Sequence, residues 1–198
     1  MPLSSPTERE PLHRRSIDLR GYRRADGLFD VEAHLTDTKA LPFNTHDRGT
    51  IPPGEPLHDM WLRLTVDRDL LITACEASTD ASPYRMCPEV TPNYARLAGV
   101  RIGAGFRRAV AERLGGAEGC THLRELLAQM ATVAFQTLAG ERRAAAAEDP
   151  EARARQRRSM LNSCYAYAPD SPVSLRRWPE LAEAAAQGAA EGSSSREN

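Results

Sequence analysis

Residues 28–36 read LFDVEAHLT, and from Phe29 to Thr36 apolar and polar residues alternate along this stretch, which makes it the clearest indicator of the fold. A period of two is typical of a β-strand with one buried face. A second strand is expected over 16–24, since the Asp26-Gly27 pair between the two segments favours a hairpin turn. Residues 60–66 alternate in the same way, and 70–78 follow a short turn. The first half of the chain therefore predicts a small antiparallel sheet.

Helical spacing replaces this alternation after about residue 88. Residues 89–97 and 106–114 are each predicted to form a short helix that ends at glycine. Over 123–138 the apolar residues recur at i, i+3, i+4 and i+7, which is the stripe of an amphipathic helix. We therefore expect an α+β fold, with a small antiparallel sheet of about three to five strands and about three helices packed on one face.

The two ends of the chain differ in composition from its middle. Residues 1–12 contain three prolines and mixed charge, and they predict a disordered arm. Residues 181–198 end in GSSSREN and are too poor in hydrophobic residues to order themselves, so they predict a disordered tail. Residues 13–180 between them are expected to form a single α+β domain.

The charge balance limits the classes of partner. Lysine and arginine together number 26 and aspartate and glutamate 27, for a net charge of -1, so no global field attracts nucleic acid or an anionic membrane. The chain has no apolar stretch of about eighteen residues and no signal-peptide pattern near its start. We therefore expect a cytoplasmic protein with reduced thiols and a small-molecule ligand. The sequence leaves the oligomeric state open.

Cys120 and His122 are the first candidates for chemistry. None of the four cysteines has the CxxC spacing of a structural zinc ribbon. Thr121 is the expected N-cap of the long helix, so Cys120 lies at the helix start. Free backbone N–H groups there favour an anion such as a thiolate, which is the form that binds metals. The alternative is a buried small cysteine with a histidine packed on the first turn.

His58 and Asp59 lie at the mouth of the strand 60–66, and one of the two should face the core because strand neighbours point to opposite faces. If this strand end meets the helix starts, Asp59, Cys120 and His122 form a mixed site for a single zinc or iron ion. His58 and Cys87 are then candidate catalytic acid–base residues, Cys87 because Pro88 after it suits a helix start. The alternatives are an ordinary turn aspartate and a structural cysteine.

Three protein ligands leave a coordination position open for water or substrate, which is the pattern of catalytic metal sites. The sequence therefore predicts a cytoplasmic metal-dependent enzyme acting on a small, carboxylated or acylated molecule. Two alternatives stay open. One is a non-enzymatic metal-binding or assembly module, and the other is a metal-free thiol enzyme that uses Cys87 or Cys120.

Five motifs together resemble an uncharacterised bacterial family, catalogued as a domain of unknown function, over about residues 8–180. They are GYRR at 21–24, DTK at 37–39, GEPLHDM at 54–60, TDASPY at 79–84 and GCTHL at 119–123. In that family the segment matching 161–165 usually ends with histidine, whereas this chain has Tyr165. The resemblance implies no activity.

The order of sheet then helices resembles the NifU-like iron–sulfur assembly scaffolds over about residues 57–138. In those proteins an aspartate opens a strand and a cysteine beside a histidine starts the last long helix, positions that Asp59, Cys120 and His122 match. The other scaffold cysteines correspond to Leu57 and to a position near Ser82. The resemblance thus implies a scaffold-like fold with a single-ion site rather than a cluster.

Overall fold

The computed structural model describes residues 3–182, and the chain divides after Ala139 into two compact units. The fold is α+β, as the sequence predicted. The elements of the first unit are β1 (His13–Arg23), β2 (Phe29–Lys39), β3 (Phe43–Thr45), β4 (Gly49–Ile51), β5 (Pro56–Val66), β6 (Ile72–Ala81), η1 (Cys87–Leu97), α1 (Phe106–Leu114), η2 (Gly116–Glu118) and α2 (Thr121–Thr137). Those of the second are α3 (Ala139–Glu148), α4 (Pro150–Met160), η3 (Tyr165–Tyr167) and α5 (Pro172–Arg177).

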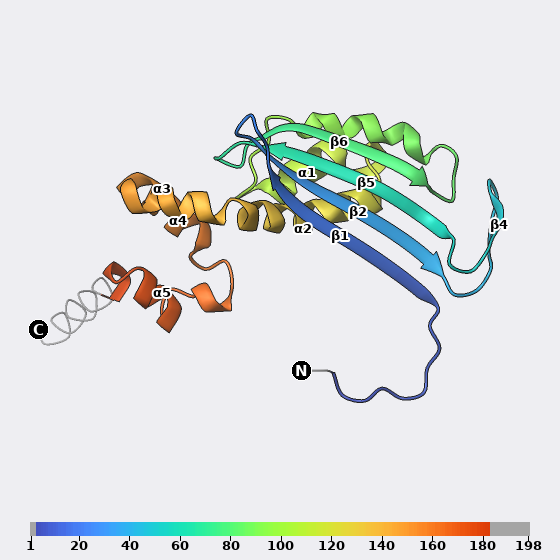
Figure 1. Ribbon diagram of the computed structural model, residues 1–198, viewed down its shortest axis with the longest axis horizontal. Helices are drawn as coiled ribbons and strands as arrows, with labels where there is room; N and C mark the ends of the chain where they lie inside the picture. Colours follow the sequence, from blue (N-terminus) through green and yellow to red (C-terminus); the bar gives the residue numbers. More distant parts are fainter. Residues whose placement is uncertain (1–2, 183–198) are drawn as a thin grey trace, which may run out of the picture. The chain divides into compact units, whose positions relative to one another are not determined.

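The main sheet has four strands in the order β1-β2-β5-β6, and every neighbouring pair is antiparallel (Figure 1). The turn between β1 and β2 contains Gly27 at φ +84°, a left-handed conformation that favours glycine, as the Asp-Gly signal predicted. β3 and β4 form a separate small hairpin.

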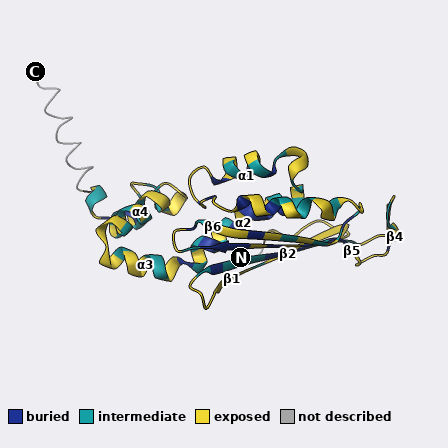
Figure 2. Cartoon of the chain, turned by 90° about the horizontal axis from the view of Figure 1, so that it is seen from above, coloured by how far each residue is buried: buried dark blue, intermediate teal, exposed yellow. Residues whose placement is uncertain are grey.

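The two faces of the main sheet differ in cover. Along β2 the residues Phe29, Val31, Ala33 and Leu35 are buried, while those between them are partly exposed. α1 and α2 lie on the face that these buried residues share, here called the helix-side face (Figure 2). The opposite face of the first unit, here called the open face, has no helix over it among residues 3–139.

The core is the layer between the helix-side face and α2. The predicted apolar stripe of α2 is buried there, at Leu123, Leu126, Leu127 and Met130. Burying each such side chain contributes roughly 1.5–3 kcal/mol. β1 approaches the end of α2 so closely that a Cβ added at Gly21 would lie 1.8 Å from the Thr137 hydroxyl oxygen.

Three boundaries differ from the sequence prediction. β1 begins at His13 rather than Ser16, because β2 continues to Lys39 and the two strands pair along this whole length. The stretch 40–57, whose four prolines and two glycines favour a loop, contains the β3–β4 hairpin and the start of β5. The helix expected over 89–97 is a 3-10 helix that starts at Cys87.

The second unit is helical. Pro150 begins α4, and the Asp149 carboxylate before it accepts a hydrogen bond from the Glu151 backbone N–H at 2.8 Å. Trp178 is buried with its ring centroid 5.8 Å from that of Tyr167. The single domain predicted over 13–180 stays a prediction.

At the chain ends, residues 3–12 are exposed and form no helix or strand. Residues 1–2 of the predicted arm and 183–198 of the predicted tail lie outside the described residues. Among the helices within 3–182, none is long and apolar enough to cross a membrane.

Candidate metal centre

Strand register places three polar residues in one row across the sheet. Arg15 of β1 is paired with Asp37 of β2, and Asp37 is paired with His58 of β5. Directly opposed residues in antiparallel strands share a face. Leu35 and Met60, which also pair across β2 and β5, are buried in the core, so the row lies on the helix-side face.

Asp37 is the centre of this row and is only 1% exposed. Its Oδ1 accepts from Arg15 Nε at 2.9 Å and lies 3.1 Å from His13 Nε2. Its Oδ2 accepts from an Arg15 terminal nitrogen at 2.8 Å and lies 3.1 Å from His58 Nδ1. A buried carboxylate needs such partners, and the bidentate arginine pair is among the strongest available.

The start of α2 adds an imidazole and a thiol. The ring centroid of His122 lies 4.0 Å from that of His58, with the planes tilted by 35°. The Cys120 sulfur lies 3.8 Å from His122 Nδ1. The buried Tyr94 hydroxyl fixes the Cys120 backbone, because it accepts from the N–H at 3.1 Å and donates to the carbonyl oxygen at 3.0 Å. We call His13, Arg15, Asp37, His58, Cys120 and His122 the Asp37 cluster.

The N-cap of α2 differs from the prediction by one position. Cys120 is the N-cap residue and Thr121 is the first residue of the helix. The Cys120 side chain makes no capping hydrogen bond, so its sulfur is available to His122.

The environment of the Asp37 cluster sets the protonation of its groups. Burial alone raises the pKa of Asp37, but hydrogen bonds and charge from Arg15, with smaller effects of His58 and His13, outweigh it and hold the pKa below its usual range. Burial, and next the neighbouring His122, lowers the pKa of His58. Burial, and next the charge of Arg15, lowers the pKa of His122. Near neutral pH the carboxylate is therefore ionised and both imidazoles are neutral, which are the metal-binding forms.

The spacing of the donor atoms suits one ion. One ligand atom each from Asp37, His58 and His122 lie within 4.8 Å of one another. Two N or O ligands of a tetrahedral zinc ion are about 3.3 Å apart, and Asp37 Oδ2 and His58 Nδ1 are 3.1 Å apart. An ion bound by both of these atoms would take the place of the proton in the hydrogen bond between them. Two histidines and a carboxylate form the donor set of several catalytic zinc sites and of non-haem ferrous sites.

The predicted ligand set of Asp59, Cys120 and His122 does not form. Cys120 and His122 are neighbours, but Asp59 lies on the open face and its carboxylate accepts from His34 Nε2 at 2.6 Å. The reason is strand geometry, because Asp59 follows a residue that faces α2 and so points away from it. The carboxylate that lies beside His58 and His122 is that of Asp37.

The two predicted catalytic residues also separate. His58 lies in the Asp37 cluster. Cys87 is the first residue of η1, and its side chain makes no hydrogen bond to the Asp37 cluster within residues 3–182. The sequence interpretation missed Asp37, His13 and Arg15 as site residues.

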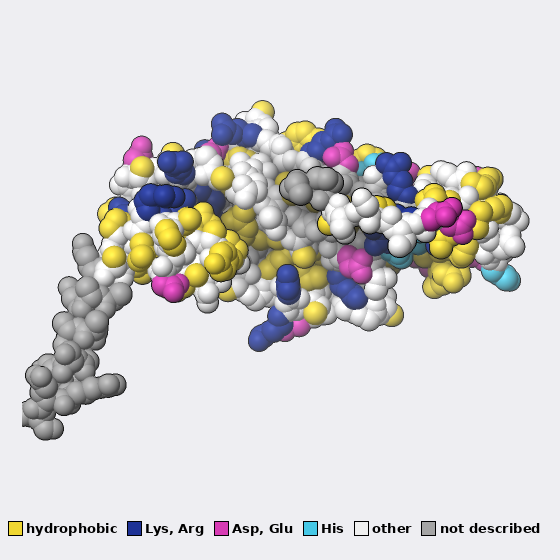
Figure 3. Space-filling model, turned by 90° about the horizontal axis from the view of Figure 1, so that it is seen from below, with side chains coloured by type: hydrophobic (Ala, Val, Ile, Leu, Met, Phe, Trp, Pro, Cys, Tyr) yellow, Lys and Arg dark blue, Asp and Glu magenta, His cyan; other side chains and the backbone are white. Residues whose placement is uncertain are grey.

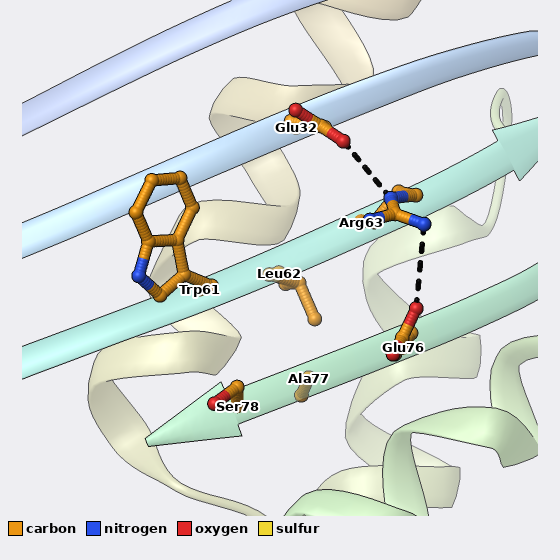
Figure 4. A pocket seen from close by; sticks show the side chains of 7 residues that line it. All are labelled: Glu32, Trp61, Leu62, Arg63, Glu76, Ala77 and Ser78. Atoms are coloured by element: carbon orange, nitrogen blue, oxygen red, sulfur yellow. Dashed lines mark hydrogen bonds and ion pairs between the residues drawn. The ribbon is translucent and has the colours of Figure 1, made fainter. Parts of the chain in front are cut away.

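The open face has a shallow hollow of about 250 Å³ beside Trp61 (Figure 4). The Arg63 guanidinium lies between the carboxylates of Glu32 and Glu76, at 2.9 and 3.5 Å. The charged groups that line the hollow are therefore paired with one another. Seen from below, acidic and basic side chains are interspersed over the described residues (Figure 3).

A family model for proteins of unknown function, designated DUF2889, matches residues 13–136. The chain belongs to this family. The match to DUF2889 begins at β1 and ends within α2, so it contains every residue of the Asp37 cluster. No curated protein and no solved structure matches the chain significantly. The resemblance to an uncharacterised family is thus confirmed, whereas its bacterial origin and the NifU-like resemblance stay predictions.

Proposed function

We propose that this DUF2889 chain is a metal-dependent enzyme that holds a single zinc or ferrous ion on Asp37, His58 and His122. The observation that carries the proposal is the convergence of three donor atoms within 4.8 Å at a buried sheet-to-helix junction. Such groups are costly to bury and are retained at functional sites more often than elsewhere.

The surrounding residues would keep the ligands in place. Arg15 and His13 contact the same carboxylate that would bind the ion, and such supporting contacts tune metal affinity. The separation of 3.8 Å between Cys120 Sγ and His122 Nδ1 is close to the roughly 3.5 Å between a thiolate and an imidazole on one zinc ion. We propose that Cys120 lies beside the coordination position that the three protein ligands would leave open.

The chemistry proposed is polarisation of an oxygen of a small, carboxylated or acylated molecule, with a bound water activated by the ion. The partly exposed His13 and Arg15 lie on the solvent side of Asp37, where cationic groups suit an anionic substrate. We place this activity in the cytoplasm, where the four free cysteines would stay reduced.

Metal content tests the proposal. Untagged protein would be analysed by plasma mass spectrometry as wild type and as His58→Gln and His122→Gln, with His34→Gln as the matched control on the open face. We expect about one zinc or iron ion per chain in the wild type and the control, and loss in the other two. No metal in any variant would contradict the proposal. Bound metal without turnover of acylated or carboxylated compounds would instead favour a binding or assembly module.

A second candidate is a metal-free thiol enzyme. It is favoured by the four contacts that already occupy Asp37 and by the proximity of Cys120 to His122. Cys120 would be the nucleophile and His122 its base. Rapid alkylation of Cys120 by iodoacetamide near pH 7, slowed in His122→Gln and unaffected by chelator, would support this candidate over the first.

A further inference from the structure

The Arg15 guanidinium lies between two carboxylates that differ in exposure. Through Nε and Nη2 it donates to the two oxygens of the buried Asp37, at 2.9 and 2.8 Å. Through Nη1 it donates to Glu125 Oε2 at 3.2 Å, and the Glu125 side chain is 65% exposed. The contact with Asp37 holds the guanidinium in place. The contact with Glu125 lies at the surface, where an ion pair contributes little to stability.

Glu125 reaches Arg15 from the first turns of α2. It follows His122 by three residues, so the two side chains lie on the same side of the helix. In a planar guanidinium Nε and Nη2 share one edge, and this edge faces Asp37. Nη1 lies off that edge and is directed to Glu125. An exposed carboxylate thus lies on the outer side of the Asp37 cluster, on the group that also contacts the proposed metal ligand.

We propose that Glu125 holds the place of the substrate's own carboxylate, and that the substrate of the metal centre is a small carboxylate anion bound by Arg15. This inference rests on the proposed function, because it names the substrate class of the same site. A free anion carries the same two oxygens as Glu125 but is not tethered to α2. It can therefore accept from the outward N–H groups of both terminal nitrogens while Arg15 keeps its bonds to Asp37.

The position of Arg15 limits the size of this substrate. Nη2 lies 2.8 Å from Asp37 Oδ2, the atom that also contacts His58 Nδ1 at 3.1 Å. A zinc ion on Oδ2 would be about 2 Å from that oxygen, and hence within about 5 Å of Nη2. The carboxylate of the substrate and the oxygen that the ion polarises would then be only a few bonds apart, as they are in a short oxo acid or an N-acyl amino acid.

Arg63 on the open face provides a matched comparison. Its guanidinium also lies between two carboxylates, those of Glu32 at 2.9 Å and Glu76 at 3.5 Å, and the Glu76 side chain is largely exposed. Neither of these carboxylates belongs to the group of donor atoms that could hold an ion. Equivalent substitutions at Arg63 and Glu76 therefore separate a general effect of surface charge from an effect of the site.

The test compares two compounds that bind zinc through the same group and differ in one charge. Both are hydroxamates, which chelate zinc. One is the monohydroxamate of succinate, which ends in a carboxylate, and the other ends in the uncharged amide of the same shape. Calorimetric titration of each into zinc-loaded full-length protein gives the ratio of their affinities. We expect the wild type to prefer the carboxylate by about tenfold or more.

Two variants test the roles of the residues. Arg15→Lys keeps the charge but loses the planar fork, so the preference should fall by about fivefold. Glu125→Gln removes the internal competitor, so the carboxylate compound should bind about threefold more tightly and the amide compound as before. Arg63→Lys and Glu76→Gln should keep the wild-type values. Because the preference is a ratio measured on one protein, changes in stability or zinc affinity cancel.

The outcomes distinguish this inference from the proposed function. Zinc binding without a preference for the carboxylate would overturn the inference and leave the metal centre intact. A preference unchanged in Arg15→Lys, or weaker binding of the carboxylate compound to Glu125→Gln, would also overturn it. Failure of both compounds to bind would do the same, since the ion would then have no open position. Absence of zinc binding in the wild type would overturn the proposed function and this inference with it.

Discussion

β2 and β5 carry two aspartate–histidine pairs, one on each face of the sheet. On the helix-side face the aspartate is Asp37 of β2 and the histidine is His58 of β5, at 3.1 Å. On the open face the roles are exchanged, with His34 on β2 and Asp59 on β5, at 2.6 Å. The shorter contact belongs to the more exposed pair, whose side chains are 30% and 26% exposed.

The difference between these pairs lies in what surrounds them. Asp37 and His58 are joined by groups from β1 and by His122 from α2, whereas His34 stacks on Trp61 with ring centroids 3.7 Å apart. An aspartate–histidine contact alone is therefore not a candidate site. The Asp37–His58 contact becomes a candidate site because burial fixes the protonation states of its groups and because α2 brings a further donor atom.

The largest effect expected from burial concerns cysteine reactivity. Burial raises the pKa of Cys75, on the helix-side face of β6, to about 12. At a pH near 8 the fraction of Cys75 present as thiolate is therefore about a thousandfold lower than that of an ordinary cysteine. Cys164 is exposed. Mass spectrometry after brief iodoacetamide treatment of native protein should find Cys164 alkylated and Cys75 intact until denaturant is added. Equal labelling of Cys75 and Cys164 in the native protein would contradict the burial of the Cys75 side chain.

The next effect concerns stability. Asp37→Asn removes a charge that Arg15 and two histidines contact, and we expect it to lower the free energy of unfolding by about 3 kcal/mol. Asp59→Asn on the open face should cost less than about 1 kcal/mol, as exposed ion pairs do. Urea unfolding of the two variants compares the faces directly. Similar losses of unfolding free energy in the two variants would contradict the difference between the buried and the exposed aspartate–histidine pair.

The smallest effect concerns pH. The pKa values of His58 and His122 are lowered from 6.5 by folding, so below about pH 6.5 the unfolded chain binds protons that the folded chain does not. The contribution of these two histidines to the free energy of unfolding is complete above that pH. It is lost as the pH falls toward their pKa values in the folded chain. Asp37, whose pKa is also lowered, keeps its stabilising contribution over this whole range, because that contribution is lost only as the pH falls below the ordinary carboxyl value of 3.8.

Urea unfolding between pH 7 and pH 5 measures this loss. The decline should be shallower in the double variant His58→Gln, His122→Gln than in the wild type. An unchanged slope in the double variant would contradict the lowered pKa values of His58 and His122.

Sequence pattern predicted the fold class and the layer of helices because alternation and helical spacing are local signals. It also identified His58, Cys120 and His122, which lie at element junctions. The burial of Asp37 could have been predicted from the sequence. The odd-numbered residues of β2 face the core, the last apolar one is Leu35, and Asp37 is the next odd-numbered residue.

Asp59 was predicted as a ligand, but it lies on the open face for a related reason. Met60, Leu62, Leu64 and Val66 are buried apolar residues of β5 that point toward the helices, so the even-numbered His58 shares their face and Asp59 does not. His13 and Arg15 could not be identified locally, because their role depends on pairing with Asp37 across strands. Register between distant segments is a property of the whole sheet.

Calorimetric titration of Zn²⁺ into metal-free protein near pH 7.4 would show whether the Asp37 cluster binds a metal ion, with His58→Gln and His34→Gln as the matched pair. We expect one site per chain in the wild type and in His34→Gln, and binding weakened by more than about tenfold in His58→Gln. Equal affinity in the two variants, or no binding in the wild type, would contradict it.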